Sequence, residues 1–252
     1  MINNKNNRID PVKEFEKEKA HNINELGNNP EVCKLAIDFI HKTAPNKYSY
    51  NFTWMGRPII AFPTDMVAMQ EIIWDVKPDL IIETGIAHGG SLIYYASILE
   101  LLGGERKVLG IDIDIRRHNR IEIEMNPMSK RIIMLEGSSI SNNIYSKVEK
   151  IAKGHKSILV CLDSNHTHDH VLKELEFYSK LVSLNSYCVV FDTIIEDLPE
   201  GFVKERPWDK GNNPKTAVGE FIKNNSNFVV DSKISGKLLI TVAPGGFLKR
   251  VK

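Results

Sequence analysis

The stretch Asp79-Leu-Ile-Ile-Glu-Thr-Gly-Ile-Ala-His-Gly-Gly-Ser91 decides the fold class. Its apolar run, residues 80–82, is typical of a strand that is buried on both faces. The run ends in an acidic residue, Glu83, and a glycine-bearing turn follows. From Ser91 onward, apolar residues recur at the spacing of an amphipathic helix. A strand, a glycine turn and a helix in this order predict an open α/β sheet with a ligand crevice at the carboxyl end of its first strand.

The turn itself indicates which ligand suits the crevice. Its sequence, Gly85-Ile-Ala-His-Gly89-Gly90, lacks the G-x-G-x-x-G spacing of a dinucleotide site. An acidic residue directly before the turn suits a ligand with an amino group better than one with a pyrophosphate. S-adenosylmethionine (SAM) is such a ligand. An NAD-dependent oxidoreductase on the same sheet is the alternative, which the missing spacing and Glu83 disfavour.

Composition limits the classes of function. The chain has 252 residues, with 33 Lys and Arg against 32 Asp and Glu, so no global basic field favours nucleic acid. This length favours one α/β domain with decorations. Cys33, Cys161 and Cys188 lack the spacing of a metal site or a redox pair, so we expect small core residues in a reducing compartment, the cytoplasm. No apolar stretch approaches the roughly 20 residues of a membrane span.

Further apolar runs repeat the pattern of the first strand. Strands, some with the turn that follows, are predicted at residues 107–114, 131–139, 157–163 and 185–192, with helices between them. The C-terminal segment predicts two more strands around Ser235-Gly236, which is a hairpin signal. Seven strands, helices between the first five and a hairpin at the end are the layout of the class I methyltransferase fold. We therefore predict this Rossmann-like sheet, with helices on both faces.

Residues 1–62 are expected to form an N-terminal arm and a helical, aromatic cap, and residues 63–252 the SAM-binding domain. Phe15 is the only aromatic anchor of the arm. Thr64 is predicted to cap the helix that precedes the first strand. Residues 194–214 are too long and too rich in Pro and Gly for an ordinary connection, so we expect a functional lid.

Two polar groups follow the second and third strands. An acid at the end of the second strand of a nucleoside-binding sheet accepts hydrogen bonds from ribose hydroxyls, and Asp112 is our candidate. Asp114 is its competitor, with capping of the next helix as the other interpretation. The backbone and hydroxyls of Ser138 and Ser139 are placed to meet a base edge, although Gly-Ser turns are common.

The fourth and fifth strands end in Asp163 and Asp192. Two carboxylates in one crevice need a cation or a shared proton. A hard divalent ion would satisfy them, and Mg²⁺ is the default. The segment that follows Asp163 carries His166, His168 and His170. A lone histidine after a strand is usually a cap or packing residue, and we assign His168 and His170 to the solvated start of the next helix.

Contacts with the substrate are expected from aromatic and polar loops. Trp54 lies in an aromatic, turn-rich stretch, where core packing and a wall over an acceptor site are both open interpretations. Within the expected lid, Arg206, Trp208 and Asn213 are candidates for substrate binding. Trp208 has a second interpretation, as a plug that holds the lid against the core.

Several segments resemble one known family, and they occur in a single order. They are Glu83-Thr-Gly-Ile-Ala-His-Gly-Gly-Ser91, Gly110-Ile-Asp-Ile-Asp-Ile-Arg116 with His118-Asn119-Arg120, Leu135-Glu-Gly-Ser-Ser139, Leu162-Asp-Ser-Asn-His-Thr-His168, Val190-Phe-Asp-Thr193, Arg206-Pro-Trp208, Gly211-Asn-Asn-Pro214 and Thr241-Val-Ala-Pro244. From about Tyr50 to the C-terminus, the chain resembles the cephalosporin hydroxylase / rhamnosyl O-methyltransferase family. The resemblance implies a SAM- and divalent-metal-dependent O-methyltransferase with a sugar acceptor, and it suggests a homo-oligomer.

The resemblance also implies roles for the residues of these segments. Those that would surround the cofactor are Glu83, Gly85 and Ser91 at its methionine part, Asp112 at its ribose and Ser139 at its adenine. His88 either packs in the cofactor turn or touches the cofactor's carboxylate. Asp163 and Asp192 would hold the metal, with Thr193 in place of the acid or amide that related enzymes have beside the second carboxylate. His166 matches a histidine base.

With these roles, the expected reaction is a methyl transfer by in-line displacement at a sulfonium carbon. Coordination to Mg²⁺ activates the sugar hydroxyl, and the His166 imidazole takes its proton. A catalytically silent accessory protein with the same fold is the second alternative. The joint presence of Asp163, His166 and Asp192 argues against it.

Overall fold

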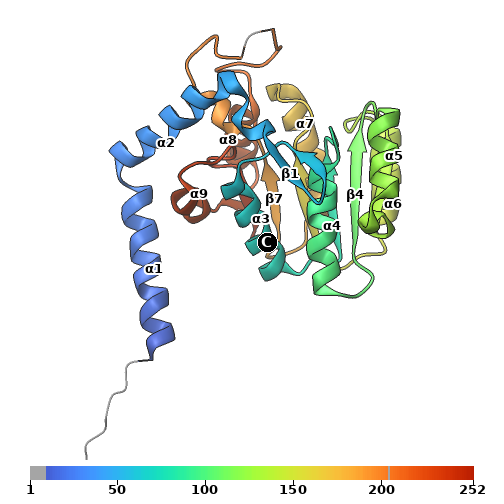
Figure 1. The fold of residues 1–252 in the computed structure, drawn as a ribbon, viewed down its shortest axis with the longest axis horizontal. Helices are drawn as coiled ribbons and strands as arrows, with labels where there is room; N and C mark the ends of the chain where they lie inside the picture. Colours follow the sequence, from blue (N-terminus) through green and yellow to red (C-terminus); the bar gives the residue numbers. More distant parts are fainter. Residues whose placement is uncertain (1–9, 204) are drawn as a thin grey trace, which may run out of the picture.

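The computed structural model of the chain describes residues 10–203 and 205–252. At its centre is a seven-stranded sheet with the strand order β5-β4-β3-β6-β7-β9-β8 (Figure 1). The strands are β3 (Leu80–Thr84), β4 (Lys107–Asp112), β5 (Ile132–Glu136), β6 (Ile158–Leu162), β7 (Tyr187–Val190), β8 (Phe228–Val230) and β9 (Phe247–Arg250). The strands β3 to β7 are parallel, and β9 is antiparallel to both of its neighbours. The predicted sheet with its C-terminal antiparallel pair is confirmed.

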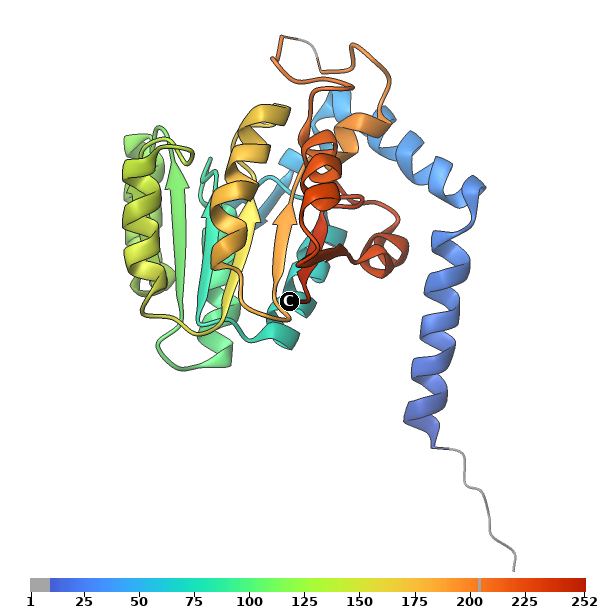
Figure 2. The ribbon, with the colours of Figure 1, turned by 180° about the vertical axis from the view of Figure 1, so that it is seen from behind.

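Helices cover both faces of the sheet (Figures 1 and 2). One face carries α3 (Pro63–Val76), α4 (Gly90–Leu102) and α5 (Arg117–Met125), and the other α6 (Asn142–Ala152), α7 (His168–Tyr178) and α8 (Pro214–Asn224). Successive strand residues point to opposite faces, so Ile81 packs in the first layer while Leu80 and Ile82 pack in the second. All three side chains are fully buried, which explains the unbroken apolar run.

The N-terminal region begins with two helices, α1 (Pro11–Gly27) and α2 (Pro30–Thr43). α1 projects away from the sheet, and none of its residues is buried (Figure 2). Phe15 is 61% exposed, so its predicted role as an anchor is wrong for this chain, and residues 1–9 of the expected arm lie outside the described residues. Among the described residues, no helix has both the length and the apolar character needed to cross a membrane.

A two-stranded hairpin, β1 (Phe52–Trp54) and β2 (Arg57–Ile59), follows after two short 3-10 helices, η1 (Ala44–Asn46) and η2 (Tyr48–Tyr50). The hairpin packs against the start of α4. A Cβ atom at Gly90 would lie 2.2 Å from the Pro58 carbonyl oxygen, so this contact requires glycine. The hairpin therefore forms a roof over the carboxyl end of β3, and the proposed division at residue 62 stays a prediction.

The two C-terminal strands pair antiparallel, but the second was predicted directly after Ser235-Gly236 and instead forms later in the chain, as β9. Ser235-Gly236 forms no hairpin turn, because it lies within a short helix, α9 (Ser232–Leu238). The apolar residues after α9 form a loop that is bound by the start of α3. There the Thr64 hydroxyl donates to the Ile240 carbonyl at 2.5 Å. Thr64 is thus a tertiary contact and not the helix cap that we predicted, because α3 begins at Pro63 and Phe62 holds the cap position.

The turn after β3 requires glycine at Gly85. This residue has φ +91°, and a Cβ atom there would lie 2.0 Å from the Asp163 carbonyl oxygen. The backbone at the end of β3 therefore touches the backbone at the end of β6. At this place the strand order reverses, since the chain moves outward from β3 to β4 and β5 and then returns to β6. Such a switch point is where open α/β sheets bind ligands.

Candidate functional site

A cavity of about 290 Å³ opens at the switch point, between the carboxyl ends of the central strands and the β1–β2 roof. An adjoining hollow of about 270 Å³ shares part of its wall, including Gly85 and Asp163. The predicted residues that line the first cavity are Glu83, Gly85, His88, Ser91, Asp163, His166 and Asp192. Those that line the second are Asp112, Ser138 and Ser139. The structure thus brings together most of the residues that the sequence pointed to.

Glu83 is a carboxyl group at the end of β3 that is 1% exposed. Ser91, in the first turn of α4, donates a hydrogen bond to its Oε2 at 2.8 Å. Burial raises the pKa of Glu83 to about 8, more than the Ser91 hydrogen bond lowers it, and the Asp112 carboxylate raises it further. A bound cation in this cavity would keep Glu83 ionised. The residue therefore fits the ammonium group of an amino-acid ligand.

Asp112 ties the second strand to the glycine turn. Its Oδ2 accepts hydrogen bonds from the backbone N–H groups of Ile86 at 2.8 Å and Ala87 at 3.2 Å. Its Oδ1 accepts from the Asp114 N–H at 3.2 Å, while α5 begins at Arg117 without a side-chain cap. The capping interpretation of Asp114 is thus wrong, and Asp112 is left at the wall between the turn and the second hollow.

The glycine turn has two further braces, Arg57 and Asn119, to which no role was assigned from the sequence. Arg57 of β2 donates from Nη2 to the His88 carbonyl at 2.6 Å and to the Asn119 side chain at 3.0 Å. Asn119, which is buried in α5, donates in turn to the Ala87 carbonyl at 2.8 Å. No local spacing links these two residues, because they converge from elements 62 positions apart.

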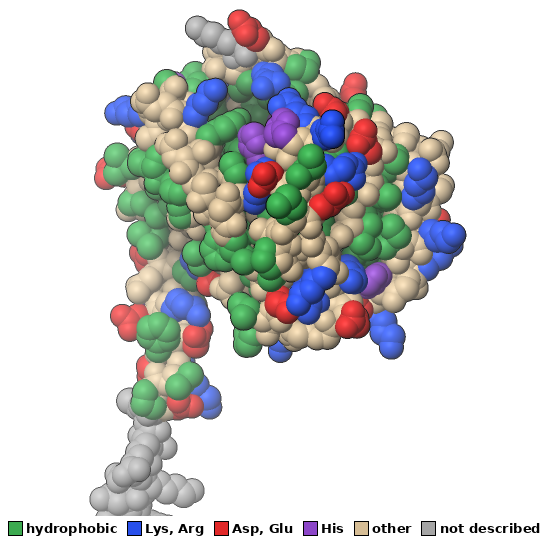
Figure 3. Space-filling view, turned by 45° about the vertical axis from the view of Figure 1, so that its right-hand side comes forward, with side chains coloured by type: hydrophobic (Ala, Val, Ile, Leu, Met, Phe, Trp, Pro, Cys, Tyr) green, Lys and Arg blue, Asp and Glu red, His purple; other side chains and the backbone are tan. Residues whose placement is uncertain are grey.

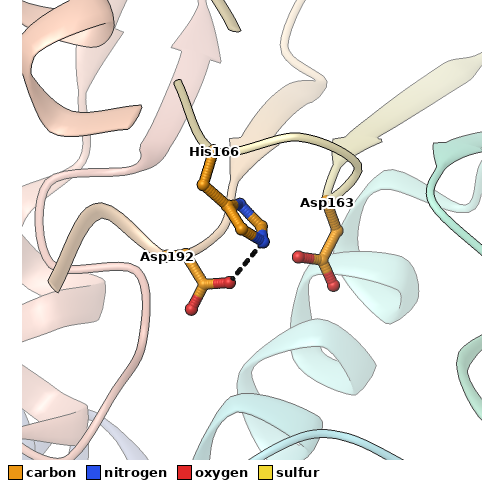
Figure 4. A group of neighbouring side chains, drawn as sticks. All are labelled: Asp163, His166 and Asp192. Atoms are coloured by element: carbon orange, nitrogen blue, oxygen red, sulfur yellow. Dashed lines mark ion pairs between the residues drawn. The ribbon is translucent and has the colours of Figure 1, made fainter. Parts of the chain in front are cut away.

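Asp163, His166 and Asp192 form the chemical centre of the cavity (Figure 4). One ligand atom from each lies within 4.8 Å of the others, and His166 Nε2 is 3.0 Å from Asp192 Oδ2. Asp192 follows β7 in the left-handed conformation, with φ +55° and ψ +20°. A non-glycine residue rarely adopts this backbone, and functional sites are enriched in such residues. In this conformation its carboxylate faces the end of β6 (Figure 4).

Burial and then the neighbouring Asp192 carboxylate raise the pKa of Asp163 well above its usual range. A divalent cation between the two carboxylates would remove this repulsion. Two carboxylate donors suit a hard ion, and the imidazole offers a third donor atom. The donor set of this cluster therefore fits a divalent metal.

Asp65 in α3 is an acidic wall residue that the sequence reasoning missed as part of the site. It is 2% exposed, and its carboxylate accepts hydrogen bonds from the Thr241 hydroxyl at 2.5 Å and the Val242 N–H at 3.0 Å. Burial raises its pKa to about 7, and Asp192 adds to the rise. An acid in the first turn of a helix is usually a helix-dipole partner, so its pattern gave no reason to choose it.

Five predicted residues line neither the cavity nor the adjoining hollow. Trp54 donates from Nε1 to Ser97 at 3.0 Å and packs edge-on against Tyr94, so it braces the roof on α4. Tyr50, from the same aromatic stretch, does line the cavity. Thr193 is fully buried, and its hydroxyl donates to the Pro244 carbonyl at 3.1 Å. The packing of Trp54 and Thr193 gives both a structural role.

Asn213 is the third of these residues. It is fully buried, caps α8 and donates from Nδ2 to Glu196 at 2.5 Å. Arg206, the fourth, is exposed and stacks over Trp208, with 5.4 Å from its guanidinium carbon to the ring centroid. Trp208, the fifth, packs edge-on against His166 at 4.9 Å between ring centroids. The loop after β7 therefore reaches the site through Trp208 and its contact with His166.

The two histidines assigned to a solvated helix start are both packed. His168 Nδ1 lies 2.8 Å from the Thr216 hydroxyl, and its Nε2 lies 3.2 Å from Glu220 of α8. His170 lines the second hollow, where its Nε2 lies 3.1 Å from the Ser139 hydroxyl. Assignment of these two residues to a solvated face was wrong, because α8 and the turn after β5 cover this end of α7.

Comparisons with known proteins show the family to which the chain belongs. A family model described as Rhamnosyl O-methyltransferase/CmcI matches residues 46–251. The rhamnosyl O-methyltransferase of Mycobacterium bovis (strain BCG / Pasteur 1173P2) is 31% identical over 205 residues, which cover 79% of this chain and 78% of the relative. That of Mycobacterium leprae (strain TN) is 28% identical over 163 residues, which cover 63% of this chain and 68% of the relative.

Solved structures show the same fold. The structure named CmcI-N160 apo-structure matches with a TM-score of 0.58 at 18% identity, over 81% of this chain and 77% of that one. The structure named cmcI-D160 Mg-SAM matches with a TM-score of 0.57 at 17% identity, over 81% of this chain and 78% of that one. At this identity the likeness concerns the fold. Because the family model covers most of the chain, the protein belongs to the rhamnosyl O-methyltransferase/CmcI family.

Proposed function

We propose that this protein is a SAM- and divalent-metal-dependent O-methyltransferase that acts on a hydroxyl of a sugar. The observation that carries the proposal is the Asp163–His166–Asp192 cluster, which lies in the same cavity as the buried Glu83. The family supplies the reaction class, and the related structure named for Mg and SAM supports both cofactors. The names of the curated relatives favour a rhamnosyl group as the acceptor.

The two adjoining hollows match the two ends of SAM. When bound, SAM supplies an electrophilic methyl group on a sulfonium. Glu83 binds its ammonium group, and the N-terminus of α4 at Gly90 and Ser91 faces its carboxylate, with His88 at the same wall. Asp112 accepts from the ribose hydroxyls, and Ser138 and Ser139 meet the base. Gly85 and Asp163 line both hollows, so they flank the middle of the ligand.

The acceptor hydroxyl lies next to the acidic cluster. Asp163 and Asp192 would hold the divalent ion, which would lower the pKa of the hydroxyl and fix its position. The His166 imidazole would take the hydroxyl proton, on the ring nitrogen that does not face Asp192, as the oxygen–methyl bond forms and the methyl–sulfur bond breaks. Asp192 Oδ2, 3.0 Å from Nε2, would accept the Nε2–H and stabilise the imidazolium that results. Trp208 packs on the ring and limits its rotation, and Arg206 beside it contacts the exposed part of the acceptor.

We also propose a homo-oligomer in the cytoplasm. The three cysteines are free thiols, and two are buried, as expected for a reducing compartment. Exposed apolar side chains lie along α1 and α2, among charged side chains of both signs (Figure 3). Val12 and Phe15 are 70% and 61% exposed on a helix with no buried residue. A projecting helix of this kind is suited to pack against a second copy of the chain.

The first prediction concerns the base. His166→Ala should reduce methyl transfer at least about 100-fold, because the hydroxyl proton loses its acceptor. The rate is measured with trideuteromethyl-SAM, Mg²⁺ and a panel of rhamnosides, by mass spectrometry of the products. Binding of Mn²⁺ and S-adenosylhomocysteine should stay within about 3-fold of the unmodified protein. His168→Ala, on the neighbouring helix start, is the matched control and should keep its activity.

Two outcomes would contradict this assignment. Full activity of His166→Ala would show that another group takes the proton. Loss of Mn²⁺ binding together with activity would make His166 a metal ligand in place of a base.

The second prediction concerns Glu83. Its pKa in the folded chain is about 8 against an ordinary value of 4.5, so the folded state binds more protons than the unfolded state between these pH values. The free energy of unfolding of the ligand-free protein should therefore fall as the pH rises through this window, by up to about 1.4 kcal/mol per pH unit from this group, and level off above it. Glu83→Gln should lack this contribution.

The measurement is urea unfolding across this pH range for three proteins. The difference in unfolding free energy between the natural chain and Glu83→Gln isolates the contribution of Glu83. Glu18→Gln on the exposed α1 is the control and should follow the natural chain. A difference that stays constant with pH would show that Glu83 is already ionised at low pH.

The third prediction concerns assembly. Phe15→Glu should shift the protein toward the monomer in sedimentation velocity, because it places a charge within the proposed contact. Asn22→Glu adds the same charge at another exposed position of α1 and should leave the assembly intact. A monomeric natural chain, or equal sedimentation of all three proteins, would rule out this contact.

A further inference from the structure

A chain of polar groups leads from the second hollow into the layer between α7 and the sheet. His170 Nε2 lies 3.1 Å from the Ser139 hydroxyl, 3.2 Å from the Ser164 hydroxyl and 3.4 Å from Glu174 Oε1. Ser164 donates a hydrogen bond to the same Glu174 oxygen at 2.7 Å. Ser139, Ser164 and His170 line the hollow, whereas Glu174 lies behind them. The four side chains thus form one connected network, which is open only to the hollow.

Glu174 is an unusual residue for its position. Its side chain is 0% exposed, on the face of α7 that packs on the sheet. Within residues 10–203 and 205–252, its second oxygen, Oε2, has no hydrogen-bond partner. Burial of a partly unpaired carboxyl group costs stability, and an apolar residue would pack there without this cost. The carboxyl group contacts only Ser164 and His170 of the network, and both of these residues line the hollow. It can therefore orient the polar groups of the hollow.

The network determines which way its hydrogen atoms point. A carboxylate only accepts, so Ser164 gives its hydroxyl hydrogen to Glu174. His170 Nε2 faces this carboxylate and two hydroxyl oxygens, which favours the tautomer with the hydrogen on Nε2. In this tautomer Nε2–H can donate to the Ser139 oxygen, which at 3.1 Å is the nearest of the three acceptors. The hydroxyl hydrogen of Ser139 is left to point into the hollow.

The backbone of Ser139 is fixed independently. Tyr178, a fully buried residue of α7, donates its hydroxyl to the Ser139 carbonyl at 2.7 Å. α7 therefore holds both the backbone and the side chain of Ser139. His168 lies two residues before His170 in α7. Both of its ring nitrogens face α8, so it takes no part in this network.

We propose that Glu174 and His170 are positioning residues that hold the Ser139 hydroxyl as a hydrogen-bond donor to a ring nitrogen of the purine base. The proposal rests on the proposed function, because it assigns the second hollow to the adenosine end of SAM. It adds a reason why this hollow selects a purine with an unprotonated ring nitrogen. Neither residue touches the reacting atoms.

The test is a calorimetric titration of S-adenosylhomocysteine and its 1-deaza, 3-deaza and 7-deaza analogues. Each analogue replaces one acceptor nitrogen of the base with C–H. The natural chain should bind one of the three about 10-fold more weakly than the parent compound, as expected for one lost hydrogen bond. In His170→Leu and in Ser139→Ala this ratio should fall below about 2-fold. His170→Gln, which keeps an N–H donor of similar reach, should restore part of the ratio.

A merely structural role of His170 would weaken all four compounds alike and leave the ratio unchanged. That result, or equal binding of all four compounds by the natural chain, would overturn the proposal. His168→Leu on the same helix is the matched control and should keep the natural ratio. If His170→Leu does not fold, Ser139→Ala alone decides, because it removes the proposed donor. Failure of the natural chain to bind S-adenosylhomocysteine at all would instead overturn the proposed function.

Discussion

The close contact between Gly85 and the backbone of Asp163 is the constraint on which the rest of the structure depends. Any side chain at Gly85 would overlap the Asp163 carbonyl, so the end of β3 and the end of β6 approach as closely as two backbones allow. This contact places Glu83 and Asp163 on the wall of one cavity. The Asp112 carboxylate then binds the N–H groups of the same turn from the other side. The glycine turn is thus fixed by both neighbouring strands.

The contact also concentrates negative charge. Glu83, Asp65, Asp163 and Asp192 line a single cavity, and burial raises the pKa of the first three. Such a cavity is unfavourable without cations. A SAM molecule brings an ammonium and a sulfonium, and a divalent ion brings two further charges. The acidic cluster therefore explains why one site takes both cofactors, and it makes ligand binding a source of stability for the folded chain.

The sequence predicted those site residues that directly follow buried strands. Glu83, Asp112, Asp163 and Asp192 come at the ends of apolar runs, and parallel strands in one sheet bring their carboxyl ends to one edge. Residues in loops were predicted less well. Asn213 lies in a loop and has a polar side chain, as a binding residue often does. Its amide instead caps α8 and donates a hydrogen bond to Glu196. Trp54 and Thr193 turned out to be packed, because local sequence does not tell which neighbour an aromatic ring or hydroxyl will meet.

Long-range contacts account for the remaining differences. The turn at Ser235-Gly236 has the local signal of a hairpin, yet Gly236 lies in α9, where it packs closely on Gly27 of α1. Asp65 resembles any acid at a helix start until the loop at Thr241 and Val242 binds it. His170 was assigned to a solvated helix start. Only the fold shows that Ser139, in the turn after β5, lies against it.

Isothermal titration of SAM into the purified protein, with and without Mg²⁺ and with NAD⁺ as the control, tests the central claim most directly. Our account predicts SAM binding in the micromolar range and no binding of NAD⁺, since the glycine turn lacks a pyrophosphate site and Glu83 favours a cation. Binding of NAD⁺ without SAM would contradict the assignment of this cavity. Absence of SAM binding both with and without the metal would contradict a methyltransferase and favour an accessory protein with this fold.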